Sequence, residues 1–565
     1  MLVKFSLLLL GCIFICTSSG ENVDDLIVEL VEPKGKIRGH VLASATGRKY
    51  YAFQEIPYGE PPVGENRFRP PKSHNGWDGI LDCTNNRKIC YQFEFPMTPI
   101  GIDHQKSMEN TKDTEVEESE DCLYLNVYTP AKPGSTDTLS VYLFIHGGAF
   151  ATGDGTFASL GPKYLIDGDI VIVTMNYRLG PFGFLSTGTD EISGNMGLKD
   201  QHLALEWTYK NIHLFGGNPQ DIVLGGESAG AYAAGYHLLS PKSKGLVSGF
   251  IQQSGSNIGV AAFLSHPRQY AFELGRALGS MDSESTDQLV IALKNASAEQ
   301  IVKASVSVHH PEPLGFIASI IWEPVIEDEY AYQAMVTSPM HQEMMLGNFN
   351  QVPCLLGFNS EESLGFMSPD ESVLKRVAAF YDKNPSMLIE SVLNVENKTL
   401  AGEKLRRVYT ASTFEEDLGA FIKFTSDVSF IRATIRQAEL TSKHVPVYLY
   451  QLSAANNINH KYPGVSHFLD MRYLWDMPPF APDTSPIDEV VREIVLRLWW
   501  NFIKYKNPTP ERDPVLQNIE WPTVGIENIR YLNLNKSMSI ETNPRNYNNL
   551  RDVLLEYMRP PFYVF

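Results

Sequence analysis

Ser228 is the residue whose setting points most directly to chemistry. It stands at the centre of the pentapeptide 226–230, Gly-Glu-Ser-Ala-Gly, which has the pattern G-x-S-x-G. An apolar run typical of a strand precedes it at 221–225, and a stretch that can form a helix follows it at 231–239. A strand, a sharp glycine turn and a helix are the setting of a nucleophile elbow, which holds a serine in a strained backbone and exposes its hydroxyl. We therefore predict that Ser228 is a nucleophile rather than a serine that happens to occupy a glycine turn.

A serine nucleophile also needs N–H groups that stabilise an oxyanion. Residues 144–150, Phe-Ile-His-Gly-Gly-Ala-Phe, lie at the end of a predicted strand and resemble the HGGG-type loop of esterases and lipases. Glycines in such a loop let backbone N–H groups face a substrate carbonyl with no Cβ in the way. Ala149 replaces the usual third glycine, and its methyl group should be tolerated if the φ of Ala149 is negative. Ala229, directly after the nucleophile, would supply the remaining N–H group.

A base must take the serine proton, and a carboxylate must orient that base. With 66 acidic residues and 14 histidines, composition selects neither. In α/β-hydrolases the acid follows the nucleophile along the chain, and the histidine follows the acid. A predicted strand at 352–356 leads to Glu361 and Glu362, and a later strand leads to His460 and His467. Catalytic groups gather at the carboxyl ends of such strands, but the spacing leaves the choice within each pair open.

The segments that must position these groups have the pattern of buried strands alternating with helices. Short apolar, β-branched runs predict strands at 141–145, 170–174, 222–224, 250–252, 352–356 and 447–450. A helical pattern at 198–215 places Leu203, Trp207 and Ile212 on one stripe. Strands that are apolar on both faces and alternate with helices predict an α/β fold, with a large, mostly parallel central sheet and helices on both faces.

Three other regions depart from this pattern. Residues 35–42 alternate in polarity and predict a small N-terminal antiparallel sheet. Residues 108–120 are acidic and poor in apolar side chains, which predicts a solvated loop. Residues 369–443 are mainly helical by pattern, and we expect them to pack over the sheet as a cap-like insertion.

The composition is that of a globular protein with one continuous domain. The 565 residues include 43% hydrophobic and 20% charged side chains, and no linker-like stretch divides them. The formal net charge of −19 argues against nucleic acid or an anionic membrane as a partner bound through bulk charge. We expect a single domain over residues 21–565, and the sequence does not specify an oligomeric state.

Residues 1–20 have the pattern of a secretory signal peptide. Lys4 supplies a positive charge, residues 5–16 are apolar but too short to span a bilayer, and small residues at 17–20 suit cleavage near Gly20. No later stretch reaches transmembrane length, so we expect secretion into the extracellular space. An oxidising compartment permits disulfides, and it permits glycans on the sequons at Asn295, Asn397 and Asn535.

Two long motifs carry a resemblance to a known family. Residues 215–230 match the serine signature of the type-B carboxylesterases of the cholinesterase-like family, and residues 120–130, Glu-Asp-Cys-Leu-Tyr-Leu-Asn-Val-Tyr-Thr-Pro, match its second signature. Segments 176–184 and 253–256 also fit, and the likeness spans residues 30 to about 560. The resemblance implies a single α/β-hydrolase domain that hydrolyses carboxylic esters without a metal or a cofactor.

The resemblance also assigns the acid and the base. The acid of the family motif G-x-N-x-x-E falls on Glu362, counted from Gly357, and the histidine of G-x-x-H falls on His467. Ser228 is then the nucleophile, His467 the general base and acid, and Glu362 the orienting carboxylate. The oxyanion hole is assigned to the N–H groups of Gly148, Ala149 and Ala229. Supporting groups near the histidine are assigned to Glu227 and Ser254.

Covalent and ionic links follow from the same resemblance. Cys90 and Cys122 match the family's first disulfide, which leaves Cys83 and Cys354 unpaired. The family's buried ion pairs correspond to Arg67 with Glu120 and to Arg178 with Asp200.

Several positions depart from the family pattern. Ser363 follows the acid where relatives usually have glycine, and Ala261 stands where many relatives have an acyl-pocket tryptophan. Residues 90–122 include no tryptophan, although cholinesterases use one there to bind choline through a cation–π contact. Cholinesterase activity is therefore not expected. Glu227 stands where juvenile hormone esterases typically have glutamine, which weighs against a dedicated hormone esterase.

We expect a secreted carboxylic ester hydrolase whose partner is a small to medium apolar ester, of xenobiotic, odorant or hormone-like type. Two alternatives are a catalytically inactive adhesion protein of the same fold and a neutral-lipid lipase. The complete set of serine, glutamate and histidine counts against the adhesion protein. A lipase would differ by preferring aggregated substrate.

Overall fold

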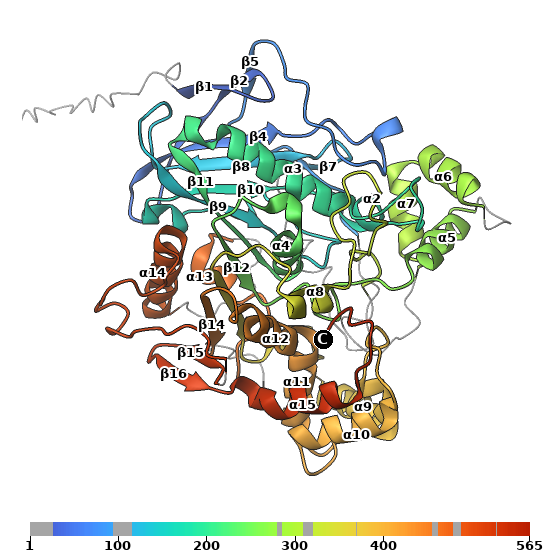
Figure 1. Cartoon of the computed structure of the whole chain (residues 1–565). Helices are drawn as coiled ribbons and strands as arrows, with labels where there is room; N and C mark the ends of the chain where they lie inside the picture. The colour runs from blue at the N-terminus through green and yellow to red at the C-terminus, as the bar shows by residue number, and fades with distance from the viewer. Residues whose placement is uncertain are drawn as a thin grey trace, which may run out of the picture.

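The computed structural model describes residues 26–93, 116–279, 285–308, 320–368, 370–454, 461–477, 488–526 and 528–565. Their central feature is an eleven-stranded mixed sheet in the order β16-β15-β14-β13-β12-β11-β9-β10-β8-β4-β3 (Figure 1). The strands are β3 (His40–Ala43), β4 (Lys49–Pro57), β8 (Tyr124–Thr129), β9 (Leu139–Ile145), β10 (Val171–Met175), β11 (Gly217–Glu227), β12 (Gly249–Gln253), β13 (Cys354–Asn359), β14 (Val447–Leu452), β15 (Arg530–Leu534) and β16 (Ser539–Thr542). The predicted signal peptide, residues 1–20, lies outside the described residues.

The seven strands from β10 to β15 run parallel, and the antiparallel pairs lie toward the two edges of the sheet. All six strands predicted from the sequence are present in this sheet. Every residue of β10, β12 and β13 is buried, as expected for strands covered on both faces. The mostly parallel α/β architecture predicted from the sequence is therefore confirmed.

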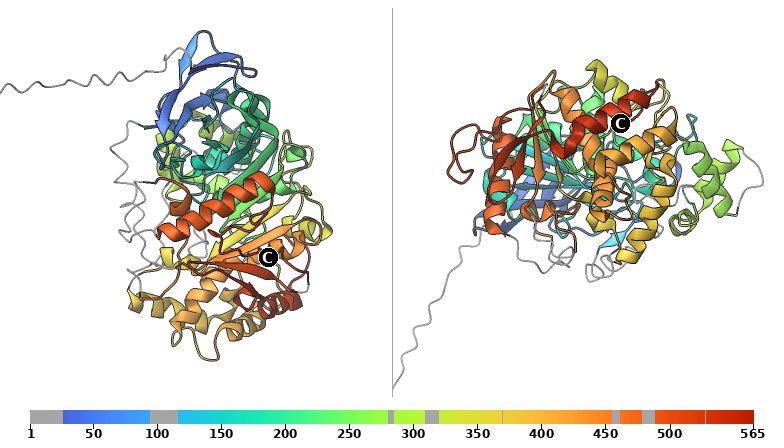
Figure 2. Two further views of the ribbon diagram at one scale, coloured as in Figure 1. Left: turned by 90° about the vertical axis from the view of Figure 1, so that its left-hand side faces the viewer. Right: turned by 90° about the horizontal axis from the view of Figure 1, so that it is seen from below.

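Helices cover both faces of the sheet because neighbouring residues of one strand point to opposite sides. In β11, Leu224 belongs to a core that includes residues of α3 (Met196–Asn211) and α4 (Ala229–Leu239), while Val223 belongs to a separate core with α14 (Glu489–Tyr505). Figures 1 and 2 show α14 on the opposite side of the sheet from α3 and α4. The predicted helix at 198–215 corresponds to α3, followed by a 3-10 helix, η4 (Ile212–Phe215).

The N-terminal region divides between two sheets. Of the residues predicted to form a small antiparallel sheet, β2 (Gly35–Arg38) pairs antiparallel with β1 (Ile27–Leu30), whereas β3 joins the edge of the large sheet. The small sheet is completed by β5 (Ile80–Asp82), which runs parallel to β2.

The helical region at 369–443 is confirmed, but only part of it covers the sheet. Its helices are α9 (Glu371–Lys383), η8 (Pro385–Leu388), α10 (Lys398–Tyr409), α11 (Leu418–Ser426), the π-helix η9 (Asp427–Ile431) and α12 (Arg432–Thr441). The last of these packs on β13 and β14, whereas α10 packs against α11 and α15 (Tyr547–Tyr557). Figure 1 shows α9 and α10 at one end of the molecule, beyond the strands.

The predicted loop at 108–120 lies largely outside the described residues. Its described part includes β7 (Glu117–Glu118), which pairs with β6 (Lys88–Ile89). Part of the expected loop is therefore a short strand. None of the helices in the described part of the chain combines the length and apolar character that a membrane crossing requires.

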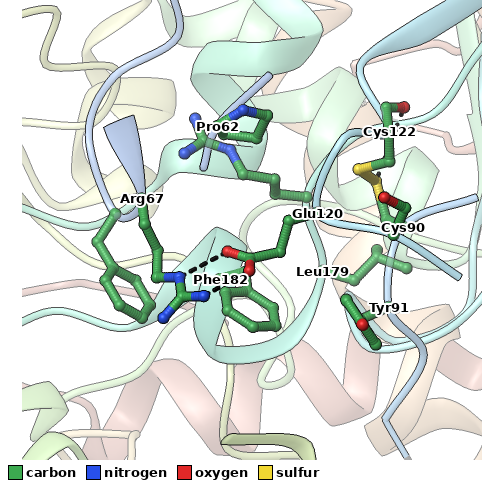
Figure 3. Close-up of a pocket in the computed structure, with 11 residues that line it drawn as sticks. Pro62, Arg67, Cys90, Tyr91, Glu120, Cys122, Leu179 and Phe182 are labelled. Atoms are coloured by element: carbon green, nitrogen blue, oxygen red, sulfur yellow. Dashed lines mark hydrogen bonds and ion pairs between the residues drawn. A yellow bond between two sulfur atoms is a disulfide. The ribbon is translucent and has the colours of Figure 1, made fainter. Parts of the chain in front are cut away.

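The predicted disulfide and ion pairs are present. Cys90 and Cys122 are bonded, while Cys83 and Cys354 are buried free thiols. Arg67 binds Glu120 through two hydrogen bonds of 2.6 and 2.5 Å beside a cavity of about 10 Å³, next to the disulfide (Figure 3).

The second ion pair is more deeply buried than the first. Arg178 donates to both oxygens of Asp200, at 2.8 and 2.7 Å, and its backbone N–H donates to the same carboxylate at 3.0 Å. The side chain of Asp200 has no exposed surface. This pair therefore fixes the start of α3 to the loop that follows β10.

Candidate active site

Ser228 lies in a turn whose geometry explains the two flanking glycines. It separates β11 from α4 and has φ 54° and ψ −123°, a backbone conformation that costs about 1–3 kcal/mol. A Cβ on Gly226 would lie 2.3 Å from the carbonyl oxygen of Gly230, and a Cβ on Gly230 would lie 2.0 Å from the carbonyl oxygen of Ile145. The N–H of Ser228 donates to Gln253 O at 2.9 Å, which holds the turn against β12. The G-x-S-x-G pattern is thus required by backbone packing.

The predicted oxyanion loop runs beside this turn. A Cβ on Gly147 would lie 3.0 Å from the Cβ of Ser228. Gly148 has φ 100°, and its carbonyl oxygen accepts hydrogen bonds from Ala151 and Thr152 at 3.0 and 2.9 Å. The N–H groups of Gly148 and Ala149 have no acceptor within the described ranges. The N–H of Ala229, in the first residue of α4, has no partner inside its helix.

The condition under which the methyl group of Ala149 should be tolerated, a negative φ, is not met. The residue has φ 54°, in the left-handed region that favours glycine. A methyl group there costs about 1–2 kcal/mol because Cβ approaches the following carbonyl. The loop therefore keeps the glycine-like backbone of the HGGG-type motif although the third glycine is missing.

His467 and Glu362 are brought together as predicted. Nδ1 of His467 lies 2.7 Å from Oε2 of Glu362, and the backbone N–H of His467 donates to Glu362 O at 3.0 Å. The other oxygen of Glu362 accepts a 2.6 Å hydrogen bond from the N–H of Asn359, at the end of β13. Since both of its oxygens are engaged, the carboxylate fixes the orientation of the imidazole ring.

The opposite side of the imidazole faces the elbow. Nε2 of His467 lies 3.2 Å from Oε1 of Glu227, the residue that directly precedes Ser228. The two carboxylates, Glu362 and Glu227, therefore lie on opposite edges of one buried ring.

The structure separates the alternatives that spacing left open for the acid. Glu361 hydrogen-bonds Arg545 at 3.1 Å rather than a histidine. Burial raises its pKa, and the charge of Arg545 partly opposes that shift. The alternative base, His460, lies outside the described residues.

Burial controls the charge of the groups around the ring. Burial raises the pKa of Glu227 to about 8, partly opposed by the charge of His467. For His467, burial lowers the pKa, but the charge of Glu227 and the hydrogen bond to Glu362 outweigh it, so its pKa lies above the ordinary value. The imidazole therefore readily takes up a proton in this setting.

Aromatic side chains enclose the imidazole. Phe430 stacks on His467 with ring centroids 4.1 Å apart and an angle of 19° between the planes, and Phe366 lies at 5.2 Å. Phe430 belongs to η9, and such π-helical insertions are rare and frequent at functional sites. Sequence reasoning missed Phe430, because the apolar pattern of 418–441 is compatible with an uninterrupted α-helix.

A buried polar network behind the histidine was also missed. Asp470 accepts hydrogen bonds from Gln253 at 2.7 Å and from Asn359 at 3.1 Å. This network joins the ends of β12 and β13 to the histidine loop. Ser254 is close by in the chain, but its hydroxyl has no hydrogen-bond partner among the described residues, so its role near the histidine stays a prediction.

Ser363, which departs from the family pattern, has a local function. Its hydroxyl lies 2.8 Å from Ser426 Oγ and 3.1 Å from Ile422 O, and its N–H donates to Ser426 Oγ at 3.1 Å. The serine therefore ties the turn of Glu362 to α11. Within the described ranges, no three His, Cys, Asp or Glu side chains are placed to hold a metal ion.

Comparison with known proteins agrees with this geometry. A model of the carboxylesterase family matches residues 24–550. The chain belongs to the carboxylesterase family. It is similar to a carboxylic ester hydrolase of Bombus ignitus, with 30% identity over 537 residues and 91% of each chain covered. It is also similar to a juvenile hormone esterase of Tribolium castaneum, with 30% identity covering 87% of this chain and 85% of the relative. Venom carboxylesterase-6 of Apis mellifera is 30% identical, with 88% of this chain and 89% of the relative covered.

The family match and these relatives show that the chain is a carboxylesterase, an enzyme that hydrolyses carboxylic esters. In this carboxylesterase, the segment predicted to form the acyl pocket is buried: Ala261 is 2% exposed. The ring of Phe263, two residues later, stacks on Tyr563 with centroids 5.0 Å apart. Whether Ala261 contacts substrate stays a prediction.

Proposed function

We propose that this carboxylesterase hydrolyses its esters through an acyl-enzyme formed on Ser228, with His467 as general base and acid and Glu362 as the orienting carboxylate. The observation that carries this proposal is the imidazole held at 2.7 Å by Glu362 with its opposite nitrogen directed at the elbow. A carboxylate on Nδ1 keeps the proton there and leaves a lone pair on Nε2, which lies 3.2 Å from Glu227 Oε1 in the structure, to accept the serine proton.

The proposed reaction has two halves. Oγ of Ser228 attacks the ester carbonyl while Nε2 of His467 takes the hydroxyl proton, and the oxyanion is stabilised by the N–H groups of Gly148, Ala149 and Ala229. The imidazolium then gives its proton to the leaving alcohol, and the C–O bond of the ester breaks. Water attacks the acyl-enzyme with the same base, which releases the carboxylic acid and restores Ser228.

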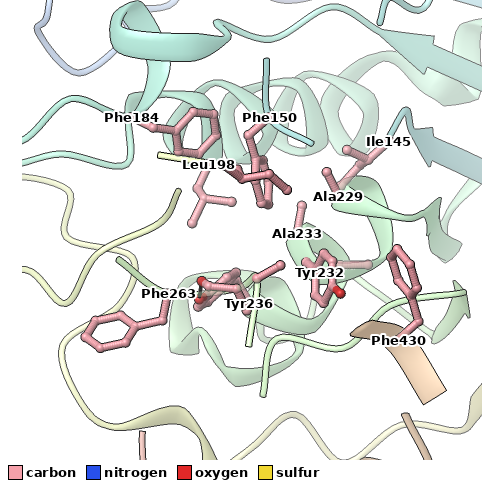
Figure 4. Packing of buried hydrophobic residues seen from close by; sticks show 14 of the residues in the cluster. Ile145, Phe150, Phe184, Leu198, Ala229, Tyr232, Ala233, Tyr236, Phe263 and Phe430 are labelled. Atoms are coloured by element: carbon pink, nitrogen blue, oxygen red, sulfur yellow. Dashed lines mark hydrogen bonds between the residues drawn. The ribbon is translucent and has the colours of Figure 1, made fainter. Parts of the chain in front are cut away.

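The substrate class that we propose is small to medium apolar esters. The support is the apolar character of the packing beside Ser228: residues of α4, η9 and the 258–264 segment belong to one buried hydrophobic core, shown in part in Figure 4. Replacing Ser228 with alanine tests the proposed function: turnover of p-nitrophenyl acetate should be lost while the circular dichroism spectrum is unchanged. Turnover near that of the unmodified enzyme would contradict it.

We also propose that residues 1–20 are removed and that the enzyme is secreted. A buried disulfide between Cys90 and Cys122 supports an oxidising compartment. The proposed glycan sites Asn295 and Asn397 are exposed, and Asn535 is partly exposed. N-terminal sequencing of protein from the culture medium should begin near Glu21, and peptide:N-glycosidase should lower its mass. Retention of residues 1–20 would contradict the proposal.

A further inference from the structure

Glu323 is a buried carboxyl group without a partner. It is 5% exposed and makes no hydrogen bond or ion pair with any residue in the described part of the chain. Glu327, four positions later, is equally buried at 5%, but it binds Lys199 at 2.5 Å and Asn195 at 2.8 Å. Buried polar groups are normally hydrogen-bonded, because an unpaired one costs free energy. The isolation of Glu323 is therefore exceptional even within its own segment.

The backbone around Glu323 is fixed next to the predicted acyl pocket. The carbonyl of Pro324 accepts a 2.9 Å hydrogen bond from the N–H of Leu264. The side chain of Asn195 accepts a hydrogen bond from the N–H of Val325 at 2.9 Å and donates one to the carbonyl of Val325 at 2.8 Å. Glu323 is thus held beside the 261–264 segment rather than lying on a free loop.

Two tyrosines of α4 link this carboxyl group to the nucleophile. The hydroxyl of Tyr236 contacts Ala262 O, in the same 261–264 segment that binds the carbonyl of Pro324. Burial raises the pKa of Tyr232 and of Tyr236, and the charge of Glu323 adds to that shift. Tyr232 follows Ser228 by one helical turn, and its N–H donates to Ser228 O at 3.0 Å. Figure 4 shows Tyr236 toward Phe263 and Tyr232 toward Phe430 on this face of α4.

Neither phenol donates its proton to Glu323. The hydroxyl of Tyr232 donates to Ser429 O at 2.9 Å, and that of Tyr236 donates to Ala262 O. Burial raises the pKa of Glu323 well above its ordinary value, which favours the neutral acid, able both to donate and to accept a hydrogen bond. A ligand ammonium group beside it would favour the carboxylate instead. A buried carboxyl group without a partner, held beside the predicted acyl-pocket segment, is suited to pair with a ligand.

We propose that Glu323 is a specificity-determining residue that hydrogen-bonds a polar group on the acyl chain of the ester, so that the enzyme prefers hydroxyacyl or aminoacyl esters over plain alkyl esters of the same length. This inference rests on the proposed function and deepens it. A site that hydrogen-bonds a substrate hydroxyl discriminates strongly against the analogue without it, because the protein group is then left unpaired.

The test compares matched p-nitrophenyl esters whose acyl chains differ only in a terminal hydrogen, hydroxyl or ammonium group. In the unmodified enzyme, kcat/KM for the hydroxyacyl or the aminoacyl series should exceed that of the alkyl series. Glu323→Leu, which removes the hydrogen-bonding group at similar volume, should lower that ratio by at least about tenfold. The same variant should have a higher Tm, because an unpaired buried acid is replaced by an apolar side chain.

Two further variants make the outcome decisive. Glu323→Gln should retain the hydroxyacyl preference and lose any additional preference for the ammonium group. This variant provides the test if Glu323→Leu does not fold. Glu329→Gln, at an exposed position of the same segment, should leave all ratios unchanged. An unchanged ratio in Glu323→Leu would overturn the inference, and so would an aminoacyl preference of the unmodified enzyme that survives in Glu323→Gln. Failure to hydrolyse p-nitrophenyl acetate at all would instead overturn the proposed function.

Discussion

Replacing Glu362 with glutamine should inactivate the enzyme through the tautomer of His467. The N–H of Asn359 donates to Oε1 of Glu362 at 2.6 Å, so a glutamine at 362 must place its carbonyl oxygen there. Its NH₂ group then faces Nδ1 of His467, where the carboxylate oxygen now lies at 2.7 Å. The imidazole must accept that hydrogen bond at Nδ1 and carry its proton on Nε2. A protonated Nε2 cannot take the proton of Ser228.

The expected loss in kcat is about 10³- to 10⁴-fold, with little change in the fold. Steady-state hydrolysis of p-nitrophenyl acetate measures it, and circular dichroism with thermal unfolding checks the fold. Glu361→Gln is the matched control, because Glu361 hydrogen-bonds Arg545 and not His467. Its kcat should stay within a few-fold of that of the unmodified enzyme. Near-normal turnover in Glu362→Gln, or an inactive Glu361→Gln, would refute the reasoning.

Three further predictions concern charge, stability and substrate choice. Glu227 and His467 titrate as a coupled pair, because burial raises the pKa of Glu227 to about 8 and its ionised form raises the pKa of His467. Glu227→Gln should therefore leave a single ionisation on the acidic limb of the kcat/KM profile, at lower pH than in the unmodified enzyme, and a profile unchanged in shape and position would count against the coupling. Asp200→Asn leaves Arg178 buried without its charged partner, and should lower the free energy of unfolding by about 3–5 kcal/mol in denaturant titrations. The control is Glu32→Gln in the exposed pair with Lys210, which should cost about 0–1 kcal/mol, and equal losses would contradict the assigned burial. Ala261→Trp should suppress turnover of long and branched acyl esters while sparing acetates, and an unchanged acyl-length profile would show that Ala261 does not line the pocket.

Much of the fold could be predicted because its main determinants are local. The central strands are short β-branched runs buried on both faces, so each is recognisable without knowledge of its neighbours. The elbow could be predicted for the same reason, since Gly226 and Gly230 are required by contacts within and directly beside the turn. The resemblance to a known family, rather than spacing, selected Glu362 and His467.

The rest depends on contacts between distant parts of the chain. Glu361 and Glu362 are adjacent in sequence, and it is the contact with Arg545, 184 residues away, that sets Glu361 apart. Phe430 belongs to a π-helical insertion and stacks on the imidazole, and the spacing of apolar residues in the sequence does not reveal that insertion. The positive φ of Ala149 is likewise not signalled by its residue type.

Labelling with a fluorophosphonate tests the central claim most directly, because the reagent reacts with a serine only where a base and an oxyanion hole activate it. The account predicts stoichiometric labelling that mass spectrometry maps to Ser228, loss of ester hydrolysis in step with labelling, and no labelling of Ser228→Ala. Labelling of a different residue, or hydrolysis that persists in fully labelled enzyme, would contradict the claim that Ser228 is the nucleophile.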